Sequence, residues 1–242
     1  DLVEPLSLDE AYLDVTRTRS GLTSGTAVAE AIRGAIRSEL GLTASAGVAP
    51  NRFLAKIASD WRKPDGLFVL RPQQVMDFLG PLPVERLPGV GRVMTARLAA
   101  LGVATIDDLR SLGAQALSAQ FGRWGLRLSE LALGIDDSPV RPDRPRLSIS
   151  CEDTFAEDRV LASLAPELQR LGERAWGLAQ RHGARPRTVV LKLKTAQFRT
   201  LTRSLTPPHP PRSLAELTAV VASLLQRVGL PADTRYRLAG IG

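Results

Sequence analysis

Two adjacent carboxylates, Asp9 and Glu10, interrupt the strand pattern of the segment LSLDEAYLDV at residues 6–15. Apolar residues alternate up to Leu8 and again from Ala11 onwards. An antiparallel pairing of Leu8 with Ala11 and Leu6 with Leu13, in which the residue numbers of each pair sum to 19, puts the apolar partners on one face. The two carboxylates then form a two-residue turn. Such turns favour residues that tolerate positive φ, so Asp-Glu is a poor choice for stability. Both carboxylates could instead bind a divalent cation such as Mg²⁺. A solvated acidic turn is the alternative interpretation.

Lysine is rare in this chain, and two of its four lysines, Lys56 and Lys63, follow within one segment, NRFLAKIASDWRKPDG. The lysine ammonium is a compact point charge suited to phosphate. Lys56 lies on a predicted helix outside its apolar stripe, where binding a phosphate and facing solvent are both open interpretations.

Helices and short strands are predicted around these residues. Asn51 is the expected N-cap of the helix that carries Lys56, and Gly41 is the expected C-cap of an earlier helix at 26–40. The buried face of the Lys56 helix is predicted to hold Phe53, Leu54, Ile57, Ala58 and Trp61. Strands are predicted before Pro50 and at 67–70.

Residues 72–137 are predicted to form short helices punctuated by proline and glycine. Within them, LPGVGRVMTARLAALG has the form of a helix-hairpin-helix. Gly89 and Gly91 would let the backbone turn tightly and point N–H groups at an anion, such as a DNA phosphate, without reading sequence. Arg92 and Thr95 are candidate additional contacts, and a turn without a ligand is the alternative.

The proline- and arginine-rich stretch at 138–147 is predicted to be an extended linker. After it, the predicted order is strand, helix, two strands, helix and strand, which indicates a ferredoxin-like βαββαβ layer. The predicted elements are strands at 146–155, 188–196, 199–206 and 234–242 and helices at 159–182 and 213–228.

Positive charge is concentrated at the C-terminal end of the chain. Residues 1–140 contain 15 Lys and Arg against 16 Asp and Glu, whereas residues 141–242 contain 17 against 9. Such an asymmetry indicates a polyanion partner, most often nucleic acid. In LKLKTAQFRTLTRS, basic residues alternate with apolar ones, which predicts one basic sheet face; they are Lys192, Lys194, Arg199 and Arg203. A merely solvated face is the alternative.

Composition excludes several classes of protein. No apolar run approaches the roughly 20 residues that span a bilayer, so no membrane partner is expected. The single cysteine, Cys151, cannot form an intramolecular disulfide and is expected to be buried. With only His182 and His209 as histidines, a zinc site or a His-based catalytic triad is not expected.

The motifs SLDEAYLDV, SAGVAPNRFLAKIASDWRKPDG, LPGVGRVMTARLAALGVATIDDL and VVLKLKTAQFRTLTRS together resemble the Y-family translesion DNA polymerases, in the bacterial DNA polymerase IV group. The resemblance implies an α+β, multidomain fold in the order palm, thumb and little finger. The expected boundaries are 1–71 for a partial palm, 72–137 for the helix-hairpin-helix thumb, 138–147 for the linker and 148–242 for the little finger.

The same resemblance implies error-prone nucleotidyl transfer onto a primer 3′-hydroxyl with two Mg²⁺ ions. Asp9 and Glu10 would be metal-binding catalytic residues, and Lys63, with Lys56 as a second candidate, would contact the incoming deoxynucleoside triphosphate. Residues of the little finger would hold the backbone of the primer-template DNA. The predicted contacts are Lys192, Lys194, Thr200, Thr202, Arg203 and Ser204.

In the family, a first catalytic Asp, the fingers and a C-terminal clamp-binding tail lie outside the matched motifs. We therefore expect the chain as given to lack one metal ligand and to be catalytically incomplete, and its parent to bind a sliding clamp. A bacterial cytoplasmic monomer is expected. A DNA-binding module without catalysis and a nuclease using the same acidic pair are the competing hypotheses, although no candidate water-activating base was found for the nuclease.

Overall fold

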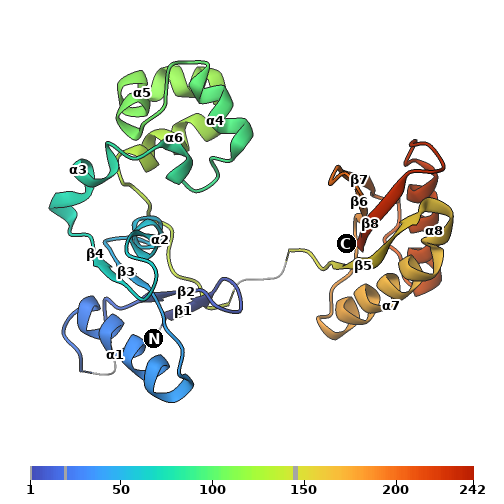
Figure 1. Ribbon diagram of the computed structural model, residues 1–242, viewed down its shortest axis with the longest axis horizontal. Helices are drawn as coiled ribbons and strands as arrows, with labels where there is room; N and C mark the ends of the chain where they lie inside the picture. Colours follow the sequence, from blue (N-terminus) through green and yellow to red (C-terminus); the bar gives the residue numbers. More distant parts are fainter. Residues whose placement is uncertain (1, 19–20, 144–146) are drawn as a thin grey trace. The chain divides into compact units, whose positions relative to one another are not determined.

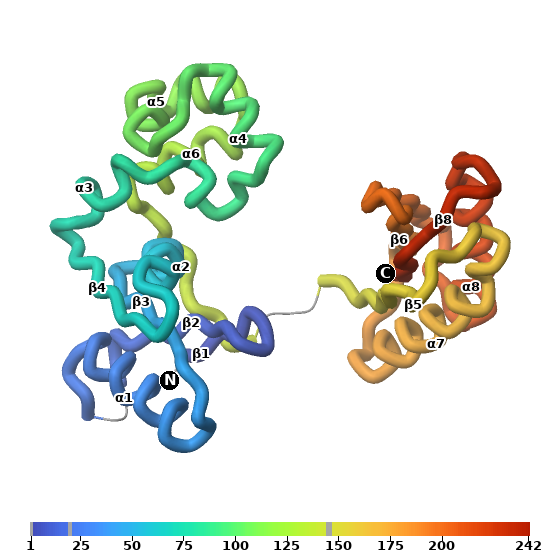
Figure 2. Tube along the Cα trace, in the orientation of Figure 1, coloured from blue at the N-terminus to red at the C-terminus, as the bar shows by residue number. Residues whose placement is uncertain are grey.

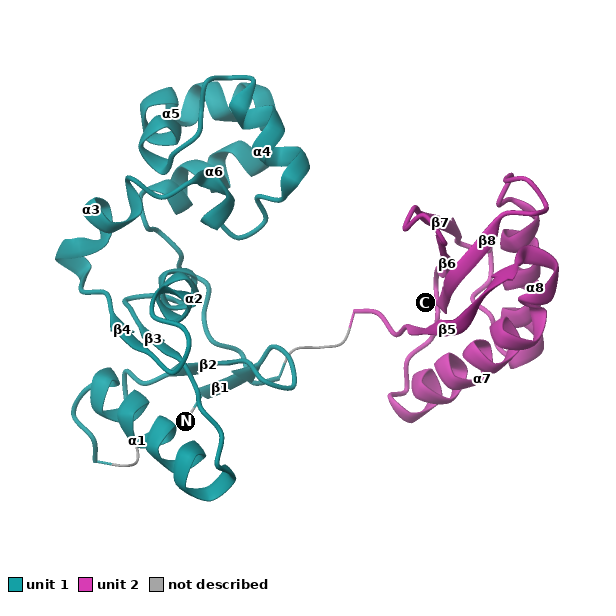
Figure 3. Ribbon diagram, viewed as in Figure 1, with its two compact units in different colours: residues 1–144 teal, residues 145–242 magenta. Residues whose placement is uncertain are grey.

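The computed structural model describes residues 2–18, 21–143 and 147–242, and it divides the chain into two compact units, residues 1–144 and 145–242 (Figure 3). Each unit has its own buried apolar cluster. The finer division into palm, thumb and linker remains a prediction. No helix among the described residues is long and apolar enough to cross a membrane.

The first unit begins with a short antiparallel hairpin, followed by a helix and a pair of parallel strands (Figure 1). The hairpin consists of β1 (Leu2–Pro5) and β2 (Ala11–Asp14), and the parallel pair consists of β3 (Ala46–Val48) and β4 (Leu67–Val69). Helix α1 (Gly25–Leu40) lies between the hairpin and β3, and α2 (Arg52–Trp61) connects β3 to β4. Gly41 ends α1 in the left-handed region (φ 64°), and Asn51 caps α2, as predicted.

The remainder of the first unit is helical. Its helices are α3 (Val75–Leu79), α4 (Arg92–Ala99), α5 (Ile106–Phe121) and α6 (Arg123–Ala132). The apolar face of α2 and these helices form one continuous cluster, so the helical region is packed against the strand region without a break in the core. Trp61 departs from the predicted buried face of α2: it is 46% exposed, because it lies at the helix end, where it packs against Phe68 and Phe78 at the edge of the cluster.

The second unit has the predicted order of strands and helices. It contains β5 (Cys151–Val160), α7 (Ala165–Arg181), β6 (Val189–Thr195), β7 (Thr200–Leu205), α8 (Leu214–Gln226) and β8 (Arg235–Ile241). The strands form one antiparallel sheet in the order β5-β8-β6-β7. Because β8 lies between β5 and β6, and β6 lies between β7 and β8, the unit contains two split β-α-β units.

Both helices of the second unit cover the same face of this sheet (Figure 1). In β6 the buried side chains are Val189, Leu191, Leu193 and Thr195, and the side chains between them point away from the helices. Cys151 is buried at the start of β5, as expected for a small apolar residue. Among the described residues of this unit, no helix covers the other face of the sheet.

Candidate active site and DNA-binding surfaces

The β1–β2 hairpin differs from its prediction in register. The paired residues are Leu2 with Asp14, Val3 with Leu13, and Glu4 with Tyr12, so the numbers sum to 16 and not to 19. The connection is a five-residue loop, residues 6–10, closed by hydrogen bonds from the Leu6 and Ser7 N–H groups to the Glu10 carbonyl oxygen. Because the pairing sum changes by an odd number, each residue of β1 now shares a face with the alternate set of β2 residues.

The structure explains the new register by what it buries. Glu4 is 1% exposed, and Arg52 Nη2 donates to its Oε1 at 3.1 Å while the Arg141 N–H donates to its Oε2 at 2.9 Å. A buried carboxylate needs such partners. Leu8, which the prediction paired inside the hairpin, is fully exposed in the loop.

Asp9 and Glu10 lie in this loop with their side chains engaged differently. The Ser7 hydroxyl donates to Asp9 Oδ1 at 2.6 Å, whereas Lys56 Nζ donates to Glu10 Oε1. The hydrogen bond from Ser7 lowers the pKa of Asp9, and the charges of Lys56 and Lys63 lower that pKa further. Asp9 is therefore ionised at neutral pH and lies within the electrostatic reach of both lysines.

The two lysines are thus brought toward the acidic loop by α2 and the turn that follows it. Lys63 Nζ lies 2.6 Å from Asp60 Oδ1, and this hydrogen bond raises the pKa of Lys63, as do the charges of Glu10 and Asp9. The Lys56 side chain is 34% exposed and its ammonium group is paired with Glu10, so both interpretations of this residue stay open.

The donor set of the loop suits a hard cation such as Mg²⁺. One oxygen of each carboxylate is hydrogen-bonded, and no described residue donates to Asp9 Oδ2 or Glu10 Oε2. Within the described part of the chain, no group of three or more Asp, Glu, His or Cys side chains surrounds a common point. Mg²⁺ is commonly held by one or two carboxylates together with water and substrate phosphates, so the loop fits that ion.

A groove of about 620 Å³ connects the Lys56 side of α2 with the helix-hairpin-helix loop. Lys56 and Asp60 line one wall, and the segment from Glu85 to Gly91 lines the other. Lys56 therefore contacts Glu10 and also borders this groove.

The helix-hairpin-helix loop has the predicted tight turn at Gly89, whereas Gly91 has an extended backbone that other residues also adopt. Gly89 adopts φ 86°, and a Cβ added there would lie 2.6 Å from the Trp124 ring, so both conformation and space require glycine. Gly91 is the N-cap of α4, whose first residue, Arg92, is exposed. The Thr95 hydroxyl donates to the Gly91 carbonyl oxygen at 3.2 Å. The first N–H groups of α4, which have no partner within the helix, therefore lie at an exposed loop.

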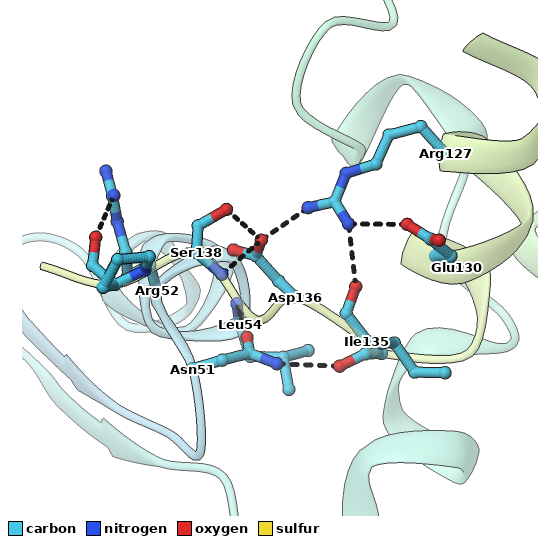
Figure 4. A network of polar contacts seen from close by, with 10 residues as sticks. Asn51, Arg52, Leu54, Arg127, Glu130, Ile135, Asp136 and Ser138 are labelled. Carbon is cyan, nitrogen blue, oxygen red and sulfur yellow. Dashed lines mark hydrogen bonds and ion pairs between the residues drawn. The ribbon is translucent and has the colours of Figure 1, made fainter. Parts of the chain in front are cut away.

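A polar network that the sequence did not reveal fastens the segment after α6 to α2 (Figure 4). Asn51 Nδ2 donates to the Gly134 carbonyl oxygen at 2.8 Å, and Arg52 Nη1 donates to the Pro139 carbonyl oxygen at 2.7 Å. Asp136 accepts hydrogen bonds from the Ser138 hydroxyl and from Arg127. The predicted linker at 138–147 therefore begins as a segment bound to the first unit (Figure 2); its residues 144–146 lie outside the described residues.

The uncovered sheet face of the second unit brings together most of the predicted DNA contacts. Lys192 is directly opposite Thr202, Lys194 is opposite Thr200, and Ser204 belongs to the same outward series of β7. Lys192 is paired with Glu152 at 2.6 Å, whereas no ion pair joins Lys194 to another described residue.

Arg203 does not belong to this face, so the predicted alternation is wrong for that residue. It is opposite the buried Leu191, and its guanidinium donates to the carbonyl oxygens of Arg227 and Val228 at 2.8 and 3.1 Å. These carbonyls follow the last turn of α8, where unpaired carbonyl groups and the helix dipole favour a cation. The geometry gives Arg203 a structural contact on the helix side of the sheet.

Models of known protein families match three parts of the chain. Residues 1–60 match the impB/mucB/samB family, residues 146–242 match the C-terminal domain of that family, and residues 85–136 match the thumb domain of DNA polymerase-iota.

Known proteins match over the whole chain. It is 57% identical over 242 residues to DNA polymerase IV of Xanthomonas campestris pv. campestris (strain 8004) and covers 67% of that relative. Among solved structures, it matches a Y-family DNA polymerase chimera, Dbh-Dpo4(243-245)-Dbh, with a TM-score of 0.84 and 30% identity, covering 100% of this chain and 70% of the other. It also matches an insertion ternary complex of Dbh DNA polymerase with a TM-score of 0.60 and 28% identity, again covering 70% of that chain.

Proposed function

Because this chain belongs to the Y family of DNA polymerases, together with the DNA polymerase IV proteins, we propose that the loop at residues 6–10 is part of its nucleotidyl-transfer site. The function of the family to which it belongs is DNA-directed DNA synthesis of the translesion type. Its substrates are DNA and a nucleotide. In the reaction, the primer 3′ oxygen attacks the α-phosphate and pyrophosphate leaves.

Asp9 and Glu10 are the groups that would hold Mg²⁺ at this loop. When bound, the ion supplies charge stabilisation for the attacking and leaving oxygens of an in-line displacement. The contribution of the chain is to keep the carboxylates ionised and oriented: Ser7 fixes Asp9, and Lys56 fixes Glu10. Lys63, half exposed beside Asp60, would bind the triphosphate of the incoming nucleotide as a point charge.

The observation that carries this proposal is the position of Lys56. It is paired with Glu10 and also lines the groove that leads to Gly89 and Gly91. A DNA strand whose phosphate is held by the N–H groups of that loop would lie in the groove with its end beside the acidic loop. We assign this path to the primer strand, with Arg92 and Thr95 as flanking contacts.

In the second unit, the outward face of β6 and β7 would hold the duplex backbone through Lys192, Lys194, Thr200, Thr202 and Ser204. Arg203 would act there indirectly, by securing β7 to α8. A sliding clamp as a further partner, a monomeric state and a bacterial cytoplasmic location belong to the same proposal.

Primer extension by the protein that contains this chain tests the role of Asp9. We expect Asp9→Asn to slow addition of one nucleotide by about 10³-fold, because it removes a charge that stabilises the transition state, while DNA affinity changes less than about two-fold. Asp14→Asn is the matched control: Asp14 ends the same hairpin and accepts from the Thr16 N–H, which an Asn side chain can also do. Asp9→Asn with a normal rate would contradict the proposal.

A DNA-binding module without catalysis is the second candidate, favoured by the basic sheet face of the second unit. Mg²⁺-dependent nucleotide binding separates the two. A module predicts that Asp9→Ala leaves nucleotide binding unchanged, whereas an active-site loop predicts that the Mg²⁺-dependent part of this binding is lost.

A further inference from the structure

We propose that Phe198, with the cations of Lys194 and Arg237 held against its ring, contacts the sugar-phosphate backbone of duplex DNA. This inference rests on the proposed function only in taking DNA as the partner. It concerns a residue at the turn between β6 and β7 that is not among the contacts proposed above.

Phe198 is placed unfavourably for a residue with only a structural role. Its side chain is 59% exposed, and its backbone lies in the left-handed region with φ 64°. A bulky residue rarely adopts this region, and glycine adopts it without strain. The ring does not belong to the apolar cluster of the second unit as far as that cluster is described. An outlier of this kind is a reason to look for a binding role.

The turn itself is held firmly by its backbone. The Phe198 N–H donates to the Thr195 carbonyl oxygen at 2.9 Å, and the Thr195 N–H donates to the Arg199 carbonyl oxygen at 2.9 Å. On the neighbouring strand, the Arg235 carbonyl oxygen accepts from the Ala196 N–H at 2.9 Å. The position of residue 198 is therefore fixed by strands on both sides, and its side chain projects from a rigid support.

Two cations gather at the exposed ring. Arg237 Cζ lies 4.0 Å and Lys194 Nζ lies 5.0 Å from the centroid of Phe198, within the range of cation–π attraction. Neither cation forms an ion pair with another described residue, in contrast to Lys192, which Glu152 neutralises. The ring thus presents two positive charges that remain available to an external anion.

The combination indicates the chemistry of the ligand. Two cations beside an apolar ring match a chain of phosphates that alternate with apolar sugar groups. The exposed hydroxyls of Thr200 and Thr202 continue along β7 from this turn, and hydroxyls are common donors to phosphate oxygens. A single apolar partner would leave the cations unpaired, and a small anion would leave the ring exposed, so the DNA backbone accounts for both features.

Fluorescence anisotropy of the full chain with a labelled duplex, measured over a series of salt concentrations, tests the inference together with thermal unfolding. We expect Phe198→Gly to weaken binding by about 3- to 10-fold without changing the dependence of log Kobs on log salt, because no charge is lost. The same variant should keep or raise the Tm, since glycine is favoured at this φ. Gln197→Gly, in the same exposed turn, is the matched control and should bind as the parent does.

Lys194→Ala measures the electrostatic contribution to duplex binding, and it should reduce the slope of log Kobs against log salt by about 1. Three outcomes of Phe198→Gly would overturn the proposal: unchanged affinity, a loss of affinity for single-stranded DNA alone, or a reduced salt slope, which would make the ring a mere support for the cations. A lowered Tm accompanying the lost affinity would likewise assign the ring to packing.

Photo-cross-linking reports proximity of residue 198 to DNA, which a purely structural role would not produce. With p-benzoylphenylalanine in place of Phe198, irradiation should attach the chain to the duplex. The same group in place of His182, which follows α7 on the covered side of the sheet, should not. Equal cross-linking at both positions would contradict the contact. Loss of primer extension in Asp9→Asn is independent of this result, so the two proposals can fail separately.

Discussion

The loop at residues 6–10 and the turn at residues 196–199 each close an antiparallel hairpin in this chain, yet they present opposite charges. In the first, two carboxylates are already partnered by a hydroxyl and a lysine, Ser7 and Lys56. In the second, two cations lie against an exposed ring, and no carboxylate among the described residues forms an ion pair with either. This difference agrees with the two proposals, in which the first hairpin would orient groups for chemistry and the second would hold a polyanion.

Catalysis should depend strongly on the acidic loop and only weakly on the turn at residues 196–199. Glu10→Gln removes the carboxylate charge that Lys56 holds, so we expect single-nucleotide addition to slow by about 10²-fold or more. Phe198→Gly should leave this rate within about two-fold when DNA is saturating. Rapid-quench kinetics measures both variants, and a slow chemical step in Phe198→Gly would contradict the division of roles.

The helix-hairpin-helix loop extends the comparison to a surface that needs no side-chain charge. Gly89→Ala places a Cβ against the Trp124 ring at φ 86°, so we expect it to lower the free energy of unfolding by about 3 kcal/mol. Gly91→Ala meets no atom within 4 Å at φ −94° and should change this free energy by less than about 0.5 kcal/mol. Urea denaturation measures both. An effect of Gly89→Ala as small as that of Gly91→Ala would contradict the requirement for glycine at position 89.

Arg203 and Lys194 lie on opposite faces of the sheet of the second unit, so their substitutions should affect different properties. Arg203→Ala leaves two carbonyl groups beyond α8 without their charged donor, so we expect the free energy of unfolding to fall by about 1.5–3 kcal/mol. Lys194→Ala should leave stability unchanged and lower the salt slope of DNA binding by about 1. If Arg203→Ala lowered the salt slope more than Lys194→Ala does, Arg203 would have to be assigned to the DNA-binding face.

The smallest expected effect concerns pH and the network beside α2. Burial would raise the pKa of Asp136, but hydrogen bonds from Ser138 and Arg127 lower it overall. A lowered folded-state pKa stabilises the fold above the unfolded value of about 4, and this contribution is lost as pH falls through the folded value. Asp136→Asn should therefore be about 1–2 kcal/mol less stable than the parent at pH 7, with a smaller difference at pH 3. A constant difference across this range would contradict the assignment.

Local pattern predicted the elements well but not the register of the first hairpin. The alternation of Leu6 and Leu8 favours a sum of 19, but both residues lie in the loop at 6–10 and the strands pair with a sum of 16. The deciding contact is the burial of Glu4 by Arg52, a residue 48 positions away. The family resemblance grouped Asp9, Glu10 and Lys63 in one expected site because it spans whole motifs, and their roles stay a prediction. In the structure the charges of Glu10 and Asp9 act on Lys63, whereas the pairing of Lys56 with Glu10 depends on tertiary packing.

The sequence also did not predict that Arg203 points to the helix side of the sheet or that Phe198 is exposed. In TLTRSL the pattern of basic and apolar residues suggested a basic outer face, but Arg203 occupies an inward position and its long side chain reaches the carbonyls after α8. The positive φ of Phe198 has no signal in the sequence, since glycine or asparagine would be expected there. The orientation of Arg203 and the backbone conformation of Phe198 depend on how the strands pair, and a local sequence pattern does not reveal that pairing.

Iron-mediated affinity cleavage tests most directly the central claim that Asp9 and Glu10 hold the catalytic cation. Fe²⁺ replaces Mg²⁺ in the protein with primer-template DNA and nucleotide, and added peroxide generates hydroxyl radicals that cut the backbone next to the ion. We predict cuts within residues 6–12 and near Lys56 and Lys63, suppressed by excess Mg²⁺ and absent in Asp9→Ala. Cuts confined to other segments, or unchanged by Asp9→Ala, would contradict the claim.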